Sequence, residues 1–340
     1  MPADQSPIRL HIISGKGGTG KSTVAAALAL SLADQGKQVL LCEVEGRQGI
    51  SRLFDLAALE NGEVQLQGFL APRADRDPSH GTLSALHIDP EAALREYLTT
   101  YFRLGPAVRA LEAFGVVEFA TSIAPGLRDV LLTGKVYEAA KVVRRRRGAR
   151  SYDAVVLDAP PTGRITRFLT ANAELAGLAK MGPIKSQAES VMASLRSPQT
   201  AIHLVTLLED MAVQETLDAV VELHSAQLPV RSVIVNGARP PLLTSEQLTL
   251  VRGGKADRGR VAAGLSSVGV VSDAGGATAL ASALLVLGEA HAERRGLEDQ
   301  QRTVLGQLDL NLVELPAHPN GIDHDVLWEF ARILRAVGTS

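Results

Sequence analysis

Residues 15–23, Gly-Lys-Gly-Gly-Thr-Gly-Lys-Ser-Thr, combine closely spaced glycines with two lysines and hydroxyl side chains. The spacing is G-x-x-x-x-G-K-[ST], in which backbone N–H groups approach phosphate oxygens where a Cβ would obstruct them. Lys21 is expected to reach the β- and γ-phosphates, and the Ser22 hydroxyl to ligate Mg²⁺. The chemistry indicated is nucleotide phosphate binding, and the expected contacts are Gly15, Lys16, Gly17, Gly18, Thr19, Gly20, Lys21, Ser22 and Thr23.

A second candidate group follows the apolar run 154–157, where Asp158 is succeeded by Ala-Pro-Pro-Thr-Gly. An acid at the end of a buried strand would hold Mg²⁺ through water, and Thr162 and Gly163 would sense the γ-phosphate as a switch. An aspartate in this position is weak evidence by itself. Together with the glycine-rich loop it predicts a Mg²⁺-dependent nucleotide site.

Two further polar residues end predicted strands. Glu45 follows an apolar run in an acidic, glycine-bearing loop, at the sheet edge where ligands bind in parallel α/β folds. Asn236 ends the apolar run 230–235. Its amide can pair with the Watson–Crick side of adenine, although asparagine is equally common as a turn cap after a strand.

The elements that must position these residues alternate along the chain. Apolar runs predict strands at 8–13, 38–44, 82–88, 152–158, 201–207, 230–235 and 310–315. Helices are expected between them, including 24–33, 213–227 and 325–337. This order predicts an α/β fold, a mostly parallel P-loop NTPase sheet flanked by helices. Residues 60–81 are expected to form a loop or weak hairpin, and 241–306 are helix and loop without assignment.

We expect one P-loop domain over residues 1–340, with an inserted helical subdomain at 90–147 and roughly 164–200. The apolar residues of this block either belong to the core or line a groove for an apolar client. Core is favoured, because apolar stripes on helices usually face the protein's own interior. The four arginines at 144–147 are expected at a helix end and on solvated surface.

Composition limits which binding partners and which cellular compartment are expected for this protein. The net charge is −2 and the chain has one cysteine, Cys42, so no nucleic-acid partner, internal disulfide or cysteine-clustered metal site is expected. The polar N-terminus has no apolar signal core, and no apolar run approaches the ~20 residues that span a bilayer. A cytoplasmic protein without stable membrane insertion is therefore expected.

The chain resembles the ArsA-type ATPase family, which includes the arsenite-pump ATPase and the targeting factor for tail-anchored membrane proteins. The resemblance depends on residues 15–23 and on Asp158-Ala-Pro-Pro-Thr-Gly-Arg-Ile-Thr-Arg-Phe-Leu at 158–169. It implies an ATP- and Mg²⁺-dependent dimer, with itself or with a paralogous subunit. Lys16 would be a signature lysine that reaches the partner's nucleotide, although a solvated loop lysine is the plain alternative. The helical subdomain would change shape with the switches and carry a membrane-protein or other apolar client.

Three departures from the family pattern bear on activity. Glu45-Gly-Arg-Gln stands where the family has Asp-Pro-Ala-His, so Glu45 would act on the attacking water one methylene further out, or not at all. Arg164 stands where histidine is common. The metalloid and zinc cysteines are missing, which disfavours metalloid export.

The favoured function is a client-handling ATPase in which Lys16, Lys21 and Glu45 are catalytic. Two alternatives remain open: a positioning ATPase that acts on DNA or membrane, and a regulatory nucleotide-binding subunit that scarcely hydrolyses ATP.

Overall fold

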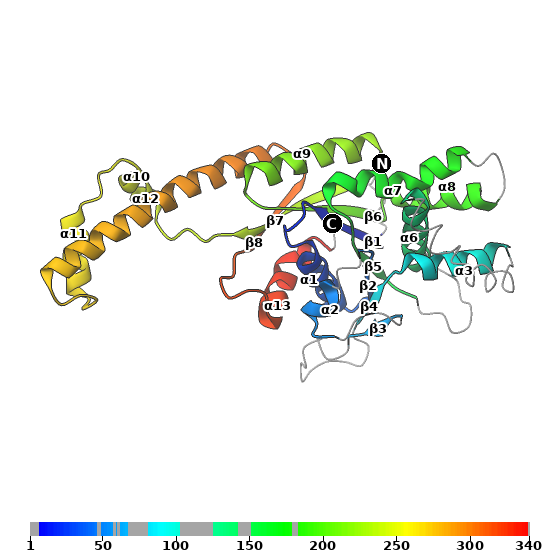
Figure 1. Ribbon diagram of the computed structural model, residues 1–340, viewed down its shortest axis with the longest axis horizontal. Helices are drawn as coiled ribbons and strands as arrows, with labels where there is room; N and C mark the ends of the chain where they lie inside the picture. Colours follow the sequence, from blue (N-terminus) through cyan, green and yellow to red (C-terminus); the bar gives the residue numbers. More distant parts are fainter. Residues whose placement is uncertain are drawn as a thin grey trace.

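The computed structural model describes residues 7–45, 49–56, 59, 62–66, 81–102, 125–141, 151–178 and 183–338. Its centre is an eight-stranded sheet with the order β3-β4-β2-β5-β1-β6-β7-β8 (Figure 1). The strands are β1 (Leu10–Gly15), β2 (Gln38–Glu43), β3 (Val64–Gln65), β4 (Thr82–His87), β5 (Ala154–Asp158), β6 (Thr200–Thr206), β7 (Val230–Ala238) and β8 (Asn311–Pro316). Every pairing is parallel except β3 with β4. The predicted mostly parallel α/β sheet is confirmed.

Helices cover both faces of the sheet. One face carries α1 (Lys21–Asp34), α2 (Gly49–Leu53), α13 (His324–Ile333) and the short 3-10 helix η2 (Leu334–Ala336). Helix α1 is rich in alanine and buried along most of its length, because small side chains let it lie between the sheet and α13. Phe330 of α13 is fully buried in this layer. The C-terminal helix α13 therefore belongs to the layer that covers this face of the sheet.

The opposite face carries α6 (Pro125–Ala140), α7 (Thr162–Leu178), α8 (Pro183–Leu195) and α9 (Asp210–Ser225), with α3 (Pro90–Phe102) against α6. Val136, Phe168 and Val191 are buried with the strands, so these helices contribute to the core. Pro125 and Pro183 each open a helix, where a proline's missing N–H costs nothing. The predicted helices at 103–124 and the arginines at 144–147 lie outside the described residues.

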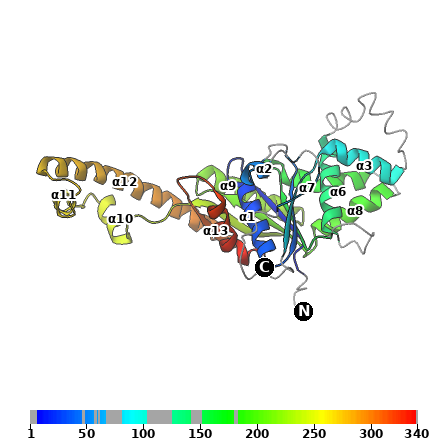
Figure 2. The ribbon, with the colours of Figure 1, turned by 90° about the horizontal axis from the view of Figure 1, so that it is seen from below.

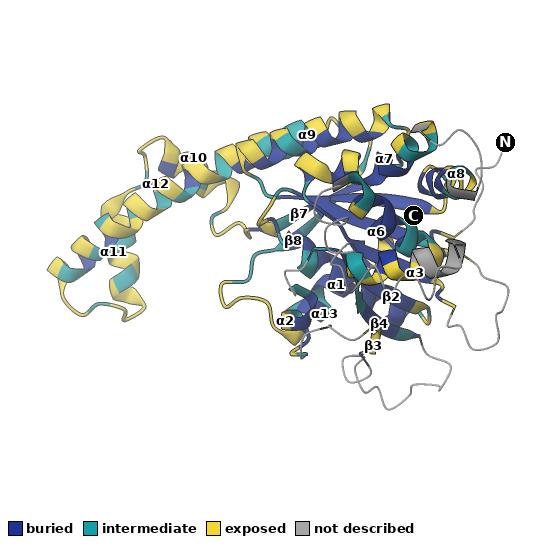
Figure 3. Ribbon diagram, turned by 45° about the vertical axis from the view of Figure 1, so that its right-hand side comes forward, coloured by how far each residue is buried: buried dark blue, intermediate teal, exposed yellow. Residues whose placement is uncertain are grey.

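The segment without a sequence assignment forms an arm that projects from the sheet (Figures 1 and 2). It comprises α10 (Ser245–Arg252), α11 (Arg258–Ser267) and the 32-residue α12 (Ala274–Leu305). At 1.5 Å per residue α12 is about 48 Å long. Only its last turns reach the body, where Arg302 pairs with Glu314 of β8 at 2.7 Å. The arm is largely exposed or half-buried (Figure 3).

Within the described residues, no helix combines the length and the apolarity that a bilayer span requires.

Candidate nucleotide-binding site

The glycine-rich loop runs from the end of β1 to the start of α1, and two of its glycines are dictated by close neighbours. Gly15 has φ 155°, and an added Cβ would overlap the carbonyl oxygen of Val205 on β6. Gly20 has φ 91°, and its Cβ would overlap the Asn236 side-chain amide. A side chain at either position would push the loop away from the sheet. These contacts hold the loop's backbone at the N-terminus of α1, where N–H groups and the helix dipole favour an anion.

A cavity of about 500 Å³ opens at this loop. The P-loop lines one side of it, α2 a second, and Ile322 from the loop between β8 and α13 a third. Its lining residues are Gly18, Gly20, Lys21, Ser22, Thr23, Gly49, Arg52, Leu53 and Ile322. An apolar side chain and a guanidinium beside a phosphate-binding loop suit a nucleotide, which has both an aromatic base and negative charge. Sequence reasoning did not single out Arg52 or Ile322.

Lys21 and Asn236 both contact backbone carbonyl oxygens of the loop. Lys21 is 9% exposed, and its Nζ lies 3.5 Å from the carbonyl oxygen of Lys16. Asn236 donates from Nδ2 to the carbonyl oxygen of Thr19 at 2.8 Å, while its Oδ1 accepts from the N–H of Gly237 at 3.0 Å. In this conformation the Asn236 amide supports the P-loop from β7.

The predicted magnesium residues are brought together. The hydroxyl of Ser22 donates to Oδ2 of Asp158 at 2.5 Å. Burial raises the pKa of Asp158 to about 6, and the Ser22 hydrogen bond and the Lys21 charge act against that rise. The hydroxyl and the carboxylate are hard oxygen donors, which magnesium prefers.

Glu43 is an additional acid that sequence reasoning did not assign to the site. It pairs in register with Asp158 across β2 and β5, is 2% exposed, and accepts from the N–H of Gly49 through Oε1 at 2.7 Å. Its Oε2 is buried without a hydrogen-bond partner among the described residues. Burial raises the pKa of the Glu43 carboxyl. An orphaned carboxylate oxygen beside Ser22 and Asp158 suits the water shell of a cation.

These donors fit a shared Mg²⁺ site better than a dedicated protein cage. No group of three or more His, Cys, Asp or Glu side chains in the described ranges is arranged to hold a metal ion alone. Magnesium in nucleotide sites keeps several waters and takes one or two protein oxygens plus phosphate. Ser22 would hold it directly and Asp158 through water, and the ion would neutralise charge on the phosphates.

Glu215 of α9 joins the predicted signature lysine to the predicted switch. Its Oε1 lies 3.0 Å from Nζ of Lys16, and its Oε2 accepts from the Thr162 hydroxyl at 3.2 Å. The Lys16 and Glu215 side chains are 33% and 38% exposed, so both are accessible from outside the chain. Thr162 is buried at the first turn of α7, directly after β5 and Asp158.

Arg164 connects Glu45 to the helical layer. Its guanidinium lies 3.6 Å from Glu45 Oε1 and 3.9 Å from Asp129 Oδ1 on α6. Burial raises the pKa of Asp129, and the nearby Arg164 charge acts against that rise. Gly46, Arg47 and Gln48 lie outside the described residues. The arginine found where the family commonly has histidine is therefore an ionic link between two elements.

A glycine-rich loop between a central parallel strand and a buried helix, with Ser22 on a strand-end aspartate, defines the class of P-loop nucleoside triphosphatases. The sequence profile of the anion-transporting ATPase family (ArsA_ATPase) matches residues 8–198 of this chain. The chain belongs to this ArsA-type family, and it is an ATPase.

The chain is similar to several named ATPases. The chain is 47% identical to ATPase BagA of Mycobacterium tuberculosis (strain ATCC 25618 / H37Rv) over 99% of this chain and 95% of BagA. It is 27% identical to an arsenical pump-driving ATPase of Acidiphilium multivorum, over 67% of this chain and 39% of that protein. It is 23% identical to ATPase get3 of Schizosaccharomyces japonicus, over 68% of this chain and 75% of that protein.

Proposed function

We propose that this protein is a Mg²⁺-dependent ATPase whose dimer opens and closes with nucleotide, and that it handles a membrane-protein or other apolar client. ATP would lie on residues 15–23, with Lys21 on the β- and γ-phosphates. Ser22 and Asp158 would hold Mg²⁺, and Thr162 and Gly163 would respond to the γ-phosphate. Glu45 would orient the attacking water. Asn236 would hold the loop, and on nucleotide binding could turn its amide toward the base.

The observation that carries this proposal is the direct connection between the site and the helical layer. Helix α7 begins at Thr162, within the site, and packs against α6 and α8. Arg164, in the first turn of α7, spans Glu45 and Asp129. A shift at Thr162 or Glu45 on phosphate binding would thus move helices on the outer face, which is the coupling a client-handling ATPase needs.

The dimer is supported by the position of Lys16. Its side chain, in the P-loop, is a third exposed, and its partner Glu215 is also accessible. A lysine held this way can exchange its carboxylate partner for the phosphates of a second subunit. A homodimer and a pairing with a paralogous chain satisfy this geometry equally.

ATP turnover measured across protein concentration tests the enzymatic part. Specific activity should rise with concentration, because Lys16 would act only across a dimer interface. Lys21→Ala should abolish turnover, and Lys16→Ala should flatten the concentration dependence. Turnover that is independent of concentration and insensitive to Lys16→Ala would contradict a trans role for this lysine.

The client-handling part has a separate readout. Binding of a hydrophobic dye should increase on adding Mg²⁺–ATP to the wild-type chain, because a client-accepting state exposes apolar surface. The Lys21→Ala variant is the control for dye that binds nucleotide-independent surface. An unchanged dye signal alongside normal ATP turnover would remove client handling and leave the ATPase.

A second candidate, a regulatory subunit with very slow hydrolysis, is favoured by the ion pair between Glu45 and Arg164. A carboxylate committed to a guanidinium is less available to a water molecule. Tight ATP binding with negligible turnover at every protein concentration, unrelieved by Glu45→Asp, would support this candidate over the first.

A further inference from the structure

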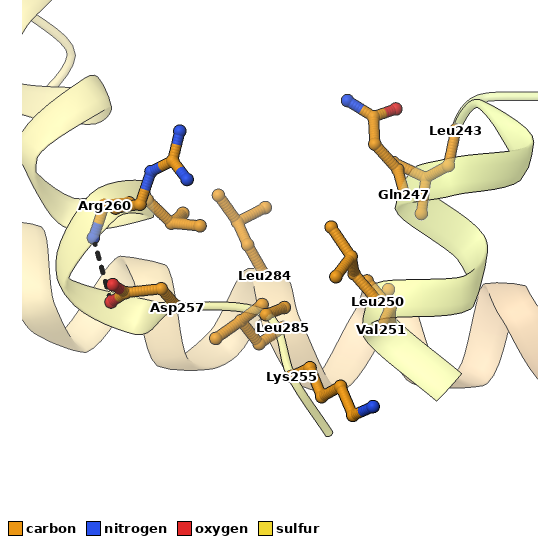
Figure 4. Close-up of a pocket in the computed structure, with 12 residues that line it drawn as sticks. Leu243, Gln247, Leu250, Val251, Lys255, Asp257, Arg260, Leu284 and Leu285 are labelled. Atoms are coloured by element: carbon orange, nitrogen blue, oxygen red, sulfur yellow. Dashed lines mark hydrogen bonds between the residues drawn. The ribbon is translucent and has the colours of Figure 1, made fainter. Parts of the chain in front are cut away.

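The arm carries a groove far from the nucleotide cavity. It has a volume of about 640 Å³ and lies between α10 and α11, with α12 as its floor (Figure 4). Leu243, Gln247, Leu250 and Val251 face it from the α10 side, and Leu284 and Leu285 from the floor. This volume is within the range of small-molecule sites, about 300–1,000 Å³.

Local contacts build this groove into the arm. Arg252 at the end of α10 donates from Nε to the carbonyl oxygen of Ala292 at 3.0 Å, which fixes α10 to α12. Val251 packs against α12 at Gly288, where even an added Cβ would make only an ordinary contact at 3.5 Å. On the other wall, Asp257 caps α11 by accepting from the N–H groups of Gly259 and Arg260 at 2.7 and 3.2 Å. Helix α11 packs along α12, so both walls are held on the floor and leave a gap between them.

The floor and one wall are apolar and accessible to solvent. Leu250 is 47% exposed and Leu284 is 42% exposed, although both are large aliphatic side chains on well-formed helices. Buried apolar area contributes about 25 cal/mol per Å², so leaving these two side chains in water forgoes stability that a bound apolar group would restore. Adjacent exposed leucines in a concave site are typical of ligand grooves.

The rim is basic. Lys255 and Arg260 line the groove, and no acidic side chain of the described arm or body pairs with either. Asp257, the only acid in the lining, is engaged by two backbone N–H groups at the start of α11. A lysine and an arginine next to an apolar floor complement a carboxylate or phosphate joined to a hydrocarbon.

We propose that this groove binds a single-chain anionic amphiphile dispersed in water. Its acyl chain would lie over Leu250, Leu284 and Leu285, and its head group would lie on Arg260 and Lys255. An extended hydrocarbon chain fits. This site is separate from the nucleotide cavity and does not depend on the proposed client handling.

Titration of the full chain with a dansylated long-chain fatty acid tests this inference. We expect saturable binding with one site per chain. Leu284→Lys should weaken it at least tenfold, because a charge on the floor replaces apolar contact with the chain. Leu287→Lys is the matched control, since Leu287 lies on the same helix, is 65% exposed and does not line the groove. It should leave affinity unchanged.

Charge reversal at the rim tests whether the anionic head group binds there. Arg260→Glu should weaken binding of the fatty acid but not of the uncharged alcohol of equal chain length. Arg258→Glu, two residues away and outside the lining, is the control. Circular dichroism and ATP turnover report whether each variant is folded.

Three outcomes would overturn the inference. Equal losses in Leu284→Lys and Leu287→Lys would show non-specific adsorption to the arm. Binding only to anionic phospholipid vesicles, with none to the dispersed fatty acid, would assign the basic rim to a membrane surface. Saturable binding of an apolar helical peptide that the fatty acid does not displace would assign the groove to a polypeptide.

Discussion

A single carboxylate, that of Glu215, contacts both the predicted signature lysine and the predicted switch threonine. It therefore gives Lys16 a partner within its own chain. If Lys16 acts on the nucleotide of a second subunit, it must first leave Glu215. The ion pair would then oppose dimer closure until phosphate charge competes for the lysine.

Replacing Glu215 with glutamine tests this competition. Glutamine keeps a hydrogen bond for Thr162 and removes the charge that holds Lys16. A half-exposed ion pair contributes about 0.2–1 kcal/mol, so the protein concentration giving half-maximal specific ATPase activity should fall by up to about fivefold. Glu222→Gln, on the same helix and bound to Thr166 instead, is the matched control. An unchanged or higher half-maximal concentration in Glu215→Gln would contradict the competition.

The individual residues that the sequence predicted are those whose role is encoded locally. The P-loop follows from spacing along one strand, loop and helix, and Asp158 from its place at the end of a separate apolar run. The structure brings Ser22 onto Asp158. Glu43, Ile322 and Glu215 acquire their positions from pairing between distant segments. Glu43 had one usable signal, because it ends the first buried strand after the P-loop helix.

Among the elements, the junction between α1 and β4 is packed with no space for a side chain at Gly81. A Cβ there would overlap the backbone oxygens of Ala33 and Lys37. Gly81→Ala should lower the free energy of unfolding by about 1–3 kcal/mol. Gly134→Ala in α6, where a Cβ meets nothing within 4 Å, should raise it by about 0.5–1 kcal/mol. Urea unfolding measures both free energies. A loss of stability in Gly81→Ala that is smaller than the gain in Gly134→Ala would contradict the packing argument.

Strands β1, β6 and β7 are linked by a buried polar chain. His11 Nδ1 lies 3.1 Å from His203 Nε2, and His203 Nδ1 lies 2.8 Å from the Ser232 hydroxyl. Burial lowers the pKa of His203 to about 3, with a smaller contribution from the Arg231 charge. Burial, the neighbouring His203 and Lys37 lower the pKa of His11 well below 6.5. Both rings are neutral in the native state at pH 7.

The two buried histidines predict that the protein loses stability as the pH falls. Below about pH 6.5 the unfolded chain binds protons that the native imidazoles do not, so stability is lost as pH falls. Each histidine should contribute up to about 1.4 kcal/mol per pH unit. Unfolding free energies between pH 7 and 5 should show this slope, and His203→Gln should reduce it. The exposed His224→Gln should not, and equal slopes in both variants would contradict the assignment.

The elements of the sheet were predictable because each buried strand is a short apolar run. The arm was not. The first half of α12 is rich in alanine, glycine and leucine without an apolar stripe, since only Ala277, Ala281 and Ala292 are buried along it before the body begins. A helix that packs through alanines on one side and exposes leucines on the other gives no clear period. The stability of α12 in the arm depends on α10 and α11, which fold back on it.

At the scale of the whole molecule, the arm and the body differ in buried apolar surface. None of α11 is buried, and α10 buries only Val251. The single tryptophan, Trp328, packs against the body's core on α13. In urea, helix content measured by circular dichroism should therefore decline before tryptophan fluorescence changes. Mg²⁺–ATP should shift the fluorescence transition to a higher urea concentration and leave the earlier loss of helix content unchanged. Coincident transitions would show that the arm and body unfold as one unit.

The base of α12 lies on the helix that carries Glu215. Gln301 of α12 is 3.5 Å from Asp210 at the start of α9, and Arg302 holds β8. Leu284 lies 17 residues before Gln301, about 25 Å along the helix axis. A tilt of about 10° at the base would displace that point by about 4 Å, from the same axial length. Helix α12 is thus a lever: an angular change of α9 too small to break any contact in the body would be multiplied into several ångströms at the distant end.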